Sequence, residues 1–172
     1  MDKVLVAYAS KHGATKEIAE KIGEVLGRRH MDVDIIPAHG VKDLSGYDAV
    51  VLGSAAYIGL WRRQAVTFLK KNREWLSALP VWLFISGPTG SGEPKELLKG
   101  WRYPKSLGQV IEEIKPRDIA CFGGRIDAGN LNLFEKWIVR NMNAPEGDFR
   151  DWDGIVAWAE ALTISGDEQT RP

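Results

Sequence analysis

Apolar residues recur along the chain in two alternating patterns. In the first, short runs of consecutive positions are apolar, which is typical of strands buried on both faces of a parallel sheet. The strands predicted on this pattern span residues 3–8, 33–36, 49–52, 81–85 and 119–123. In the second, apolar residues return every three or four positions, which indicates amphipathic helices. The helices predicted on this pattern span residues 15–29, 62–77, 106–114, 131–142 and 151–164.

Strands and helices alternate from the first run to the last. This order predicts an α/β fold, a three-layer doubly wound sandwich with a five-stranded parallel sheet. One domain is expected over residues 1–164, followed by a polar C-terminal tail at residues 165–172. The Gly- and Pro-rich stretch at residues 86–105 is predicted to be irregular. Ligands of such sheets bind beyond the carboxyl ends of the strands, so the loops after strands one, three and four are the candidate site.

Composition narrows the classes of function. The chain has 23 basic and 23 acidic residues, and this balance argues against nucleic acid as the main partner. Its single cysteine, Cys121, excludes an intrachain disulfide and a cysteine cluster for a metal, so no metal site is expected. Apolar stretches are shorter than the roughly 20 residues of a transmembrane helix, and the first one is too short for a signal peptide. A cytoplasmic protein is the expectation.

The loop after the first predicted strand carries the strongest chemical signal. It consists of Ser10, Lys11, His12, Gly13, Ala14 and Thr15. A glycine permits a tight turn, two hydroxyls supply donors, and the following helix offers N–H groups that have no partner within the helix. These features together predict a site for a phosphate. The alternative is that Ser10 or Thr15 only caps the helix.

Three common phosphate-site motifs are missing. A Walker loop continues with Lys and a hydroxyl residue, whereas Gly92 is followed by Glu93. A dinucleotide fingerprint has a third glycine where Lys95 stands. A phosphorylated receiver domain has an aspartate at the end of its third strand, where this chain has Gly53. ATP, GTP and NAD are therefore poor candidates.

With these loops placed, the chain resembles the flavodoxin family along nearly its whole length. The resemblance rests on residues 10–15, on the loop at 53–61 and on the loop at 86–92. It implies a sheet of order 2-1-3-4-5 and one FMN bound non-covalently. The residues implied to bind FMN are Ser10, Lys11, His12, Gly13, Ala14, Thr15, Ser54, Ala55, Ala56, Tyr57, Ile58, Gly59, Trp61, Ser86, Gly87, Pro88, Thr89 and Gly90.

Individual positions in these loops leave alternatives open. Tyr57 and Trp61 are aromatic side chains that either stack on the flavin ring or cover the core. His12 stands where the family often has a further hydroxyl, so it either weakens the phosphate contact or supplies an imidazole donor. The glycines at 87, 90 and 92 either close over the ring or form an ordinary flexible crossing.

Within the family, the chain is most similar to the bacterial quinone-dependent protoporphyrinogen dehydrogenases. The similarity lies in residues 53–59, 122–127 and 148–152 and in an extra helix after the fifth strand, at 131–142. It implies an FMN-dependent oxidoreductase that acts on a small aromatic substrate or a quinone. The alternatives are a flavodoxin-type electron carrier between protein partners and a non-redox module that binds a phosphate ligand. The residues assign no catalytic group, electron donor or electron acceptor.

The extra helix has an apolar stripe whose role the sequence leaves open. Its predicted face consists of Leu131, Phe134, Trp137, Ile138 and Met142, with Glu135 placed elsewhere. The face either packs on the domain, contacts a second subunit in a homodimer, covers a hydrophobic acceptor or makes a shallow, peripheral membrane contact. A group of basic residues, Arg62, Arg63, Lys70 and Lys71, is expected to be a solvated helix face that begins close to the second loop.

Overall fold

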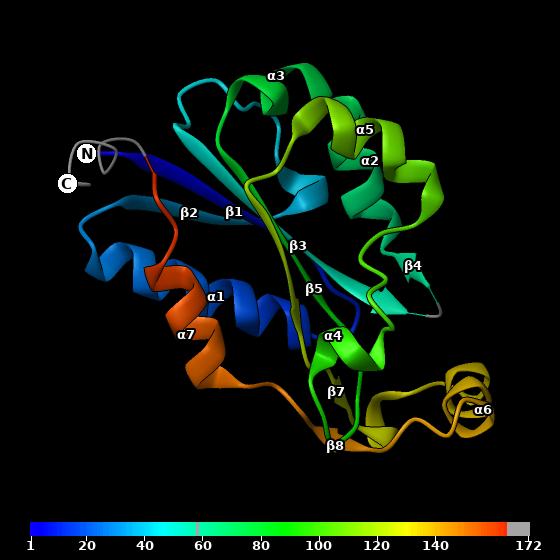
Figure 1. Ribbon diagram of the computed structural model, residues 1–172. Coiled ribbons are helices and arrows are strands. Elements are labelled where there is room, and N and C mark those ends of the chain that lie inside the picture. Colours follow the sequence, from blue (N-terminus) through cyan, green and yellow to red (C-terminus); the bar gives the residue numbers. More distant parts are fainter. Residues whose placement is uncertain (58, 165–172) are drawn as a thin grey trace.

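The computed structural model describes residues 1–57 and 59–164, so the predicted tail at 165–172 lies outside the described residues. Figure 1 shows a central twisted sheet with helices on both sides. The sheet has the order β2-β1-β3-β5-β6 and all of these strands are parallel. They span Lys3–Ala9 (β1), Asp32–Pro37 (β2), Ala49–Tyr57 (β3), Val81–Ser86 (β5) and Asp118–Phe122 (β6). The short strand β4 (Leu60–Trp61) pairs only with β3, as a hairpin, so β5 and β6 are the fourth and fifth parallel strands. The expected order 2-1-3-4-5 is therefore confirmed.

The helices form the two outer layers of the sandwich (Figure 1). One layer contains α1 (Ala14–Arg28) and α7 (Trp152–Glu160), which pack on each other. The other contains α2 (Arg63–Lys71), α3 (Arg73–Ala78) and α5 (Gly108–Ile114). Strand residues alternate between the layers: Val4 and Val6 join the core cluster beneath α1, whereas Leu5 and Ala7 join the cluster on the opposite face. Both faces are covered, and this explains the continuous apolar runs in the sequence.

The helix predicted over residues 62–77 is in fact two helices. Asn72 separates α2 from α3, and its side-chain amide donates to the carbonyl of Phe68 at 2.9 Å. Asparagine competes with helical hydrogen bonding through such local contacts, so the chain bends there.

The second predicted loop begins later than expected. Residues 53–57 continue β3, and Gly53 pairs with Tyr8 on one side and Phe84 on the other. A Cβ at position 53 would lie 2.0 Å from the Phe84 ring, so this glycine makes room for a core aromatic. The actual turn is the short hairpin between β3 and β4, where Gly59 adopts a φ of +69°.

Several short elements are absent from the sequence-based prediction. The stretch at 86–105 contains α4 (Pro94–Leu97), which corrects the expectation of an irregular segment. Three single-turn 3₁₀ helices are η1 (Ala38–Gly40), η2 (Lys105–Leu107) and η3 (Ala128–Asn130). Beyond β6, the strands β7 (Arg125–Ile126) and β8 (Gly147–Asp148) pair with each other, and the chain between them contains α6 (Leu133–Asn141).

The β7–α6–β8 segment projects from one end of the molecule, close to the carboxyl ends of the sheet strands (Figure 1). It is the extra helix expected after the fifth parallel strand. Among the described residues, none of the helices has the length and apolar character needed to cross a bilayer.

Candidate functional site

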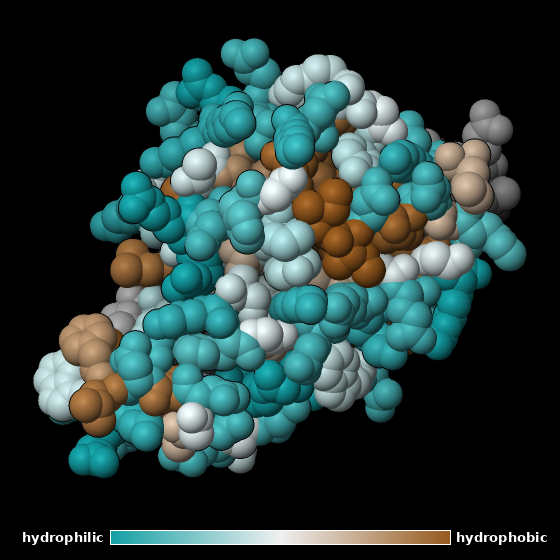
Figure 2. All heavy atoms as spheres, turned by 180° about the vertical axis from the view of Figure 1, so that it is seen from behind, coloured by the Kyte–Doolittle hydropathy of each residue, from teal (hydrophilic) through white to brown (hydrophobic). Residues whose placement is uncertain are grey.

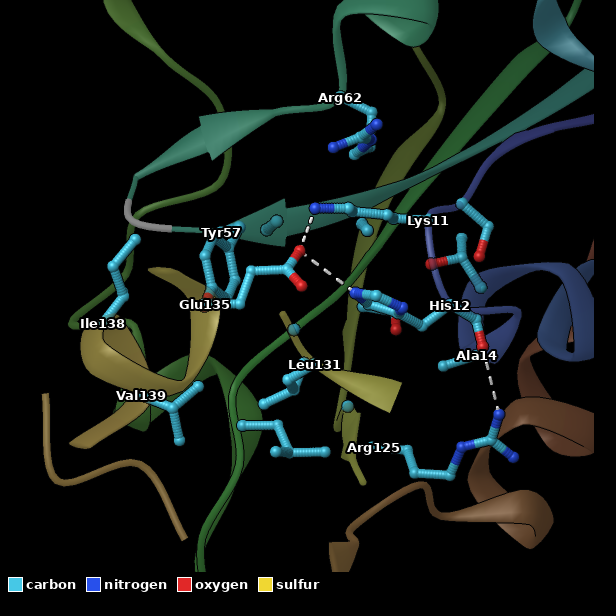
Figure 3. Close-up of a pocket in the computed structure, with 18 of the residues that line it drawn as sticks. Lys11, His12, Ala14, Tyr57, Arg62, Arg125, Leu131, Glu135, Ile138 and Val139 are labelled. Atoms are coloured by element: carbon cyan, nitrogen blue, oxygen red, sulfur yellow. Dashed lines mark hydrogen bonds and ion pairs between the residues drawn. The ribbon is translucent and has the colours of Figure 1, made fainter. Parts of the chain in front are cut away.

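A cavity of about 310 Å³ lies where the carboxyl ends of β1, β3 and β5 meet α6 (Figure 3). Its lining comes from the loop after β1, from the ends of β3 and β5, from Arg62, and from the β7–α6 segment. The three loops singled out from the sequence thus contribute to one cavity, as expected for the carboxyl edge of a doubly wound sheet.

The loop after β1 forms one end of this cavity. Gly13 precedes α1 with a φ of +88°, a left-handed conformation that favours glycine, and its N–H donates to Ser10 Oγ at 3.0 Å. Within the described chain, no side chain caps the first turn of α1, so the alternative role of Ser10 or Thr15 as a helix cap is not observed. The N-terminal N–H groups of α1 are thus left for an anion or water.

Thr15 is the unusual residue of this loop. It is only 1% exposed and lines the cavity, yet its Oγ1 has no hydrogen-bond partner among the described residues. A buried hydroxyl that lacks a partner costs about 1–3 kcal/mol. Such a group is satisfied when an acceptor, such as a phosphate oxygen, enters the cavity.

A three-residue charge cluster joins this loop to α6. Glu135 Oε1 accepts from the Lys11 ammonium and lies 3.2 Å from His12 Nε2 (Figure 3). The other carboxylate oxygen accepts from the N–H of Asn132 at 3.0 Å, and the N–H of Glu135 donates to Asn132 Oδ1 at 2.8 Å. Glu135 therefore fixes the start of α6 and pulls the Lys11 and His12 side chains toward it.

This arrangement changes the pKa values of two groups in the cavity, the Glu135 carboxylate and the Tyr57 phenol. Burial by itself raises the pKa of Glu135, but hydrogen bonds from Lys11, Asn132 and His12 outweigh burial and bring the pKa to about 2. Burial, followed by the nearby charge of Glu135, raises the pKa of Tyr57. Glu135 is consequently ionised and Tyr57 neutral at neutral pH.

A second ionic network supports the same end of the cavity from outside. Glu17, on the first turn of α1, accepts from Arg125 at 3.1 Å and from Arg150 at 2.5 Å. Arg125 also donates to the carbonyl of His12, and Arg150 to the carbonyl of Ala14, each at 3.3 Å. These contacts hold the β7–α6–β8 segment against the loop after β1.

The structure brings together many of the residues predicted for the site. Those that line the cavity are Ser10, Lys11, His12, Ala14, Thr15, Ala55, Ala56, Tyr57, Ser86 and Gly87. Those placed outside its lining are Gly13, Ser54, Gly59, Trp61, Pro88, Thr89 and Gly90, and Ile58 lies outside the described residues.

Two of the residues outside the lining have clear structural roles. Trp61 is 5% exposed, packs in the core and donates from its indole N–H to the carbonyl of Arg102 at 2.9 Å. Ser54 Oγ donates to the carbonyl of Ala55 and accepts from the N–H of Arg62, both at 3.0 Å. Trp61 therefore follows the core interpretation rather than the ring-stacking one, and Ser54 stabilises the turn into α2.

The buried face of α6 differs from the predicted apolar face, although Leu131, Phe134 and Ile138 of the predicted face do line the cavity. Glu135, Ile138 and Val139 are buried, whereas Leu133, Phe134, Trp137 and Met142 are largely exposed. Phe134 stacks on Trp137 with ring centroids 6.2 Å apart. Figure 2 shows the resulting apolar side chains at the projecting left end of the molecule. The polar Glu135 faces inward, where its carboxylate contacts Lys11 and His12.

Half of the cavity lining was not assigned to the site from the sequence, and most of these residues belong to the far wall, which is formed by residues 124–139. The lining residues that it did not assign to the site are Arg62, Gly124, Arg125, Ile126, Leu131, Asn132, Phe134, Glu135, Ile138 and Val139. One signal was available: Asn132 followed three positions later by Glu135 has the spacing of a capping box, which the structure confirms. Nothing local indicates that the Glu135 carboxylate also reaches the loop after β1.

Comparisons with known proteins identify the family of the chain and a full-length relative. The family model described as a flavodoxin domain matches residues 5–153. The curated protein "Protoporphyrinogen IX dehydrogenase [quinone]" of Escherichia coli strain K12 is 20% identical over 179 residues, which cover 98% of each chain.

Solved structures show the shared fold. A flavodoxin from the domain Archaea has a TM-score of 0.57 at 17% identity, and the match covers 92% of this chain and 94% of that one. The two-electron reduced flavodoxin of Megasphaera elsdenii has a TM-score of 0.57 at 21% identity, with 92% and 99% covered.

Proposed function

The chain belongs to the flavodoxin domain family, and on that premise we propose that its cavity binds one FMN molecule non-covalently for electron transfer. The observation that carries this proposal is the unpartnered Thr15 hydroxyl beside the uncapped N-terminus of α1. It gives the cavity one end that is incomplete without an anion.

The phosphate end fits FMN through neutral donors. The Ser10 hydroxyl already accepts from Gly13 N–H, which leaves its own proton to donate, and Thr15 Oγ1 has its full capacity left. The first N–H groups of α1 point to the same end, where the helix dipole favours negative charge. Lys11 and His12, whose side chains are taken by Glu135, are left to position α6 rather than the phosphate.

The other end of the cavity fits a planar, largely apolar ring. Ala55 and Ala56 offer small side chains at the end of β3, and Tyr57 offers an aromatic one. Ile138 and Val139 face them from α6. A ring held between these walls is shielded from water and kept at a fixed orientation. FMN itself supplies the electron chemistry when bound, and the protein supplies binding, orientation and electrostatics.

We further propose an oxidoreductase that passes electrons to a quinone or acts on a small aromatic substrate. Two observations favour an enzyme over a carrier. The E. coli relative named for a quinone-linked dehydrogenase matches over 98% of both chains. In addition, the β7–α6–β8 segment adds an apolar wall to the cavity, which suits a small substrate better than a second protein.

The first test is the affinity of the protein for FMN and for riboflavin, which lacks the phosphate. We expect a yellow protein on purification, and we expect apoprotein to bind FMN at least 100-fold more tightly than riboflavin, since about 3 kcal/mol comes from hydrogen bonds to a charged group. Colourless protein that ignores added FMN would instead favour the non-redox alternative.

The second test separates enzyme from carrier. Purified protein is mixed with a soluble naphthoquinone and a chemical reductant of the flavin, without any protein partner. Sustained quinone reduction that saturates with quinone concentration supports the enzyme. If electrons instead move at useful rates only when a partner protein is added, the chain is a flavodoxin-type carrier.

A further inference from the structure

Four basic residues of the described chain line the cavity, and three of them contact an acidic side chain. Lys11 and His12 contact Glu135, and Arg125 contacts Glu17. Arg62 differs: in the described part of the chain its side chain makes no hydrogen bond or ion pair, and its Nε is buried without an acceptor. Among the described residues, Arg62 is therefore the basic side chain of the cavity that lacks a partner.

Hydrogen bonds fix the backbone of Arg62, so the position of its unpartnered side chain is determined by the fold. Its N–H donates to Ser54 Oγ at 3.0 Å, and its carbonyl accepts from the N–H groups of Ala65 at 3.0 Å and Val66 at 3.2 Å. The residue thus stands at the junction between the β3–β4 hairpin and α2. From this fixed position the side chain reaches the cavity, while the neighbouring Arg63 is exposed and lies outside the lining.

The place of Arg62 separates it from the phosphate end. Figure 3 shows Arg62 and Ala14, the first residue of α1, on opposite sides of the Lys11–Glu135–His12 cluster. Arg62 follows the strand end that provides Ala56 and Tyr57, where the ring is proposed to lie. A single phosphate near Thr15 would leave the guanidinium still without a partner.

The chemistry of the missing partner follows from charge and burial. An Arg side chain with a buried, unpartnered Nε is stabilised best by a carboxylate or similar anion, which accepts two parallel hydrogen bonds from the guanidinium. We propose that Arg62 binds the carboxylate of a planar aromatic substrate that enters beside the flavin. This inference rests on the proposed function, because it assigns the substrate of the same cavity. It makes the preferred substrate an organic anion rather than a neutral quinone.

The test compares two aromatic probes of similar size. Equilibrium dialysis measures the dissociation constants of anthraquinone-2-carboxylate and of the uncharged 2-(hydroxymethyl)anthraquinone on FMN-loaded protein. We expect a preference of roughly 10–100-fold for the carboxylate, the range of a charge-assisted hydrogen bond. Arg62→Gln should abolish the preference, Arg62→Lys should keep part of it, and the control Arg63→Gln should keep all of it.

Several outcomes would overturn the assignment. Equal affinity of the wild-type protein for both probes would do so, as would an unchanged preference in Arg62→Gln. A tenfold or larger loss of FMN affinity in Arg62→Gln would give the guanidinium to the cofactor instead. Because the side chain has no partner within the described protein, the variants should fold, which circular dichroism checks.

The same measurement on FMN-free protein keeps the two proposals apart. If FMN does not bind, the proposed function fails. A carboxylate preference that Arg62→Gln removes would then still identify Arg62 as an anion-binding residue, whereas its absence would remove that role as well.

Discussion

The two ends of the cavity are built in different ways. The end at α1 is made by contiguous residues, 10–15, and offers neutral hydroxyl and backbone donors. The end at α6 is made by Arg62 and by lining residues between 131 and 139, and it combines apolar side chains with charges. The first end is therefore a local motif of the sequence, whereas the second consists of side chains that only the tertiary structure brings together.

The two ends are also coupled, because ion pairs join them. Glu135 on α6 contacts Lys11 and His12, while Glu17 on α1 contacts Arg125 and Arg150. The Arg150 side chain is 3% exposed and also donates to Asp148 at 2.6 Å. Ion pairs and charged hydrogen bonds therefore connect the α6 end to the loop after β1 and to α1.

The largest expected effect breaks the α1 end alone. Replacing both Ser10 and Thr15 with Ala removes two hydroxyl donors, and we expect FMN affinity to fall by roughly 100-fold or more, about 3 kcal/mol. Riboflavin affinity should hardly change, since riboflavin has no phosphate. Isothermal titration calorimetry with both ligands measures the difference.

Ser77→Ala is the matched control for this change. The Ser77 hydroxyl donates to the carbonyl of Glu74 on the exposed surface of α3, and Ser77 lies outside the cavity lining. FMN affinity that survives in the double variant would remove Ser10 and Thr15 from the phosphate site.

The next effect weakens the connection between the two ends. Glu135→Gln keeps the shape of the side chain but removes its charge, so the ion pair with Lys11 is lost and the contact with His12 is weakened. We expect the free energy of unfolding at pH 7 to fall by up to about 3 kcal/mol, because a pKa lowered by more than two units in a buried carboxyl corresponds to that order. Urea denaturation measures the loss.

The difference in stability between wild type and Glu135→Gln depends on pH, and the direction of the Glu135 pKa shift gives its sign. The folded pKa of Glu135 is about 2, below its ordinary value of 4.5, so the ionised form is favoured in the folded protein. The stabilisation is complete above pH 4.5 and disappears as the pH falls toward 2. Wild type and Glu135→Gln should therefore converge in acid. A gap that stays constant from pH 7 to pH 3 would contradict the role of this charge.

The fold itself is largely readable from the sequence, because each buried strand is a continuous apolar run and each covering helix has its own stripe. Residues such as Val4 and Leu5 are buried on opposite faces, so no alternation interrupts the run. The loop after β1, residues 10–15, is also readable as part of the cavity, because its residues are neighbours in the chain. The far wall is not, since contacts such as Glu135 with Lys11 join residues that are 124 positions apart. The buried position of Trp61 was not predictable for the same reason, because its hydrogen-bond partner Arg102 lies 41 positions away in the sequence.

A third prediction compares the inner and outer faces of α6. Ile138 is 8% exposed and Trp137 is 61% exposed, although both were expected on one apolar face. We expect Ile138→Ala to lower the free energy of unfolding by about 2 kcal/mol, the low end for a buried Ile. Trp137→Ala should change it by less than about 0.5 kcal/mol. Urea denaturation of both variants measures which side chain is buried. A larger loss of stability in Trp137→Ala than in Ile138→Ala would contradict the buried position of Ile138.

The smallest expected effect has the opposite sign and concerns the α1 end again. Thr15→Val in FMN-free protein replaces a buried hydroxyl that has no partner with a methyl group of the same shape. Threonine and valine have similar helix propensities, so the removal of the unsatisfied group should dominate and raise the free energy of unfolding by about 1 kcal/mol. The exposed Thr67 on α2 is the control, where the same change should have almost no effect. A variant that gains stability while it loses FMN affinity would identify Thr15 as a residue retained for binding at a cost to the fold. A loss of stability would mean that the hydroxyl is already satisfied in the free protein.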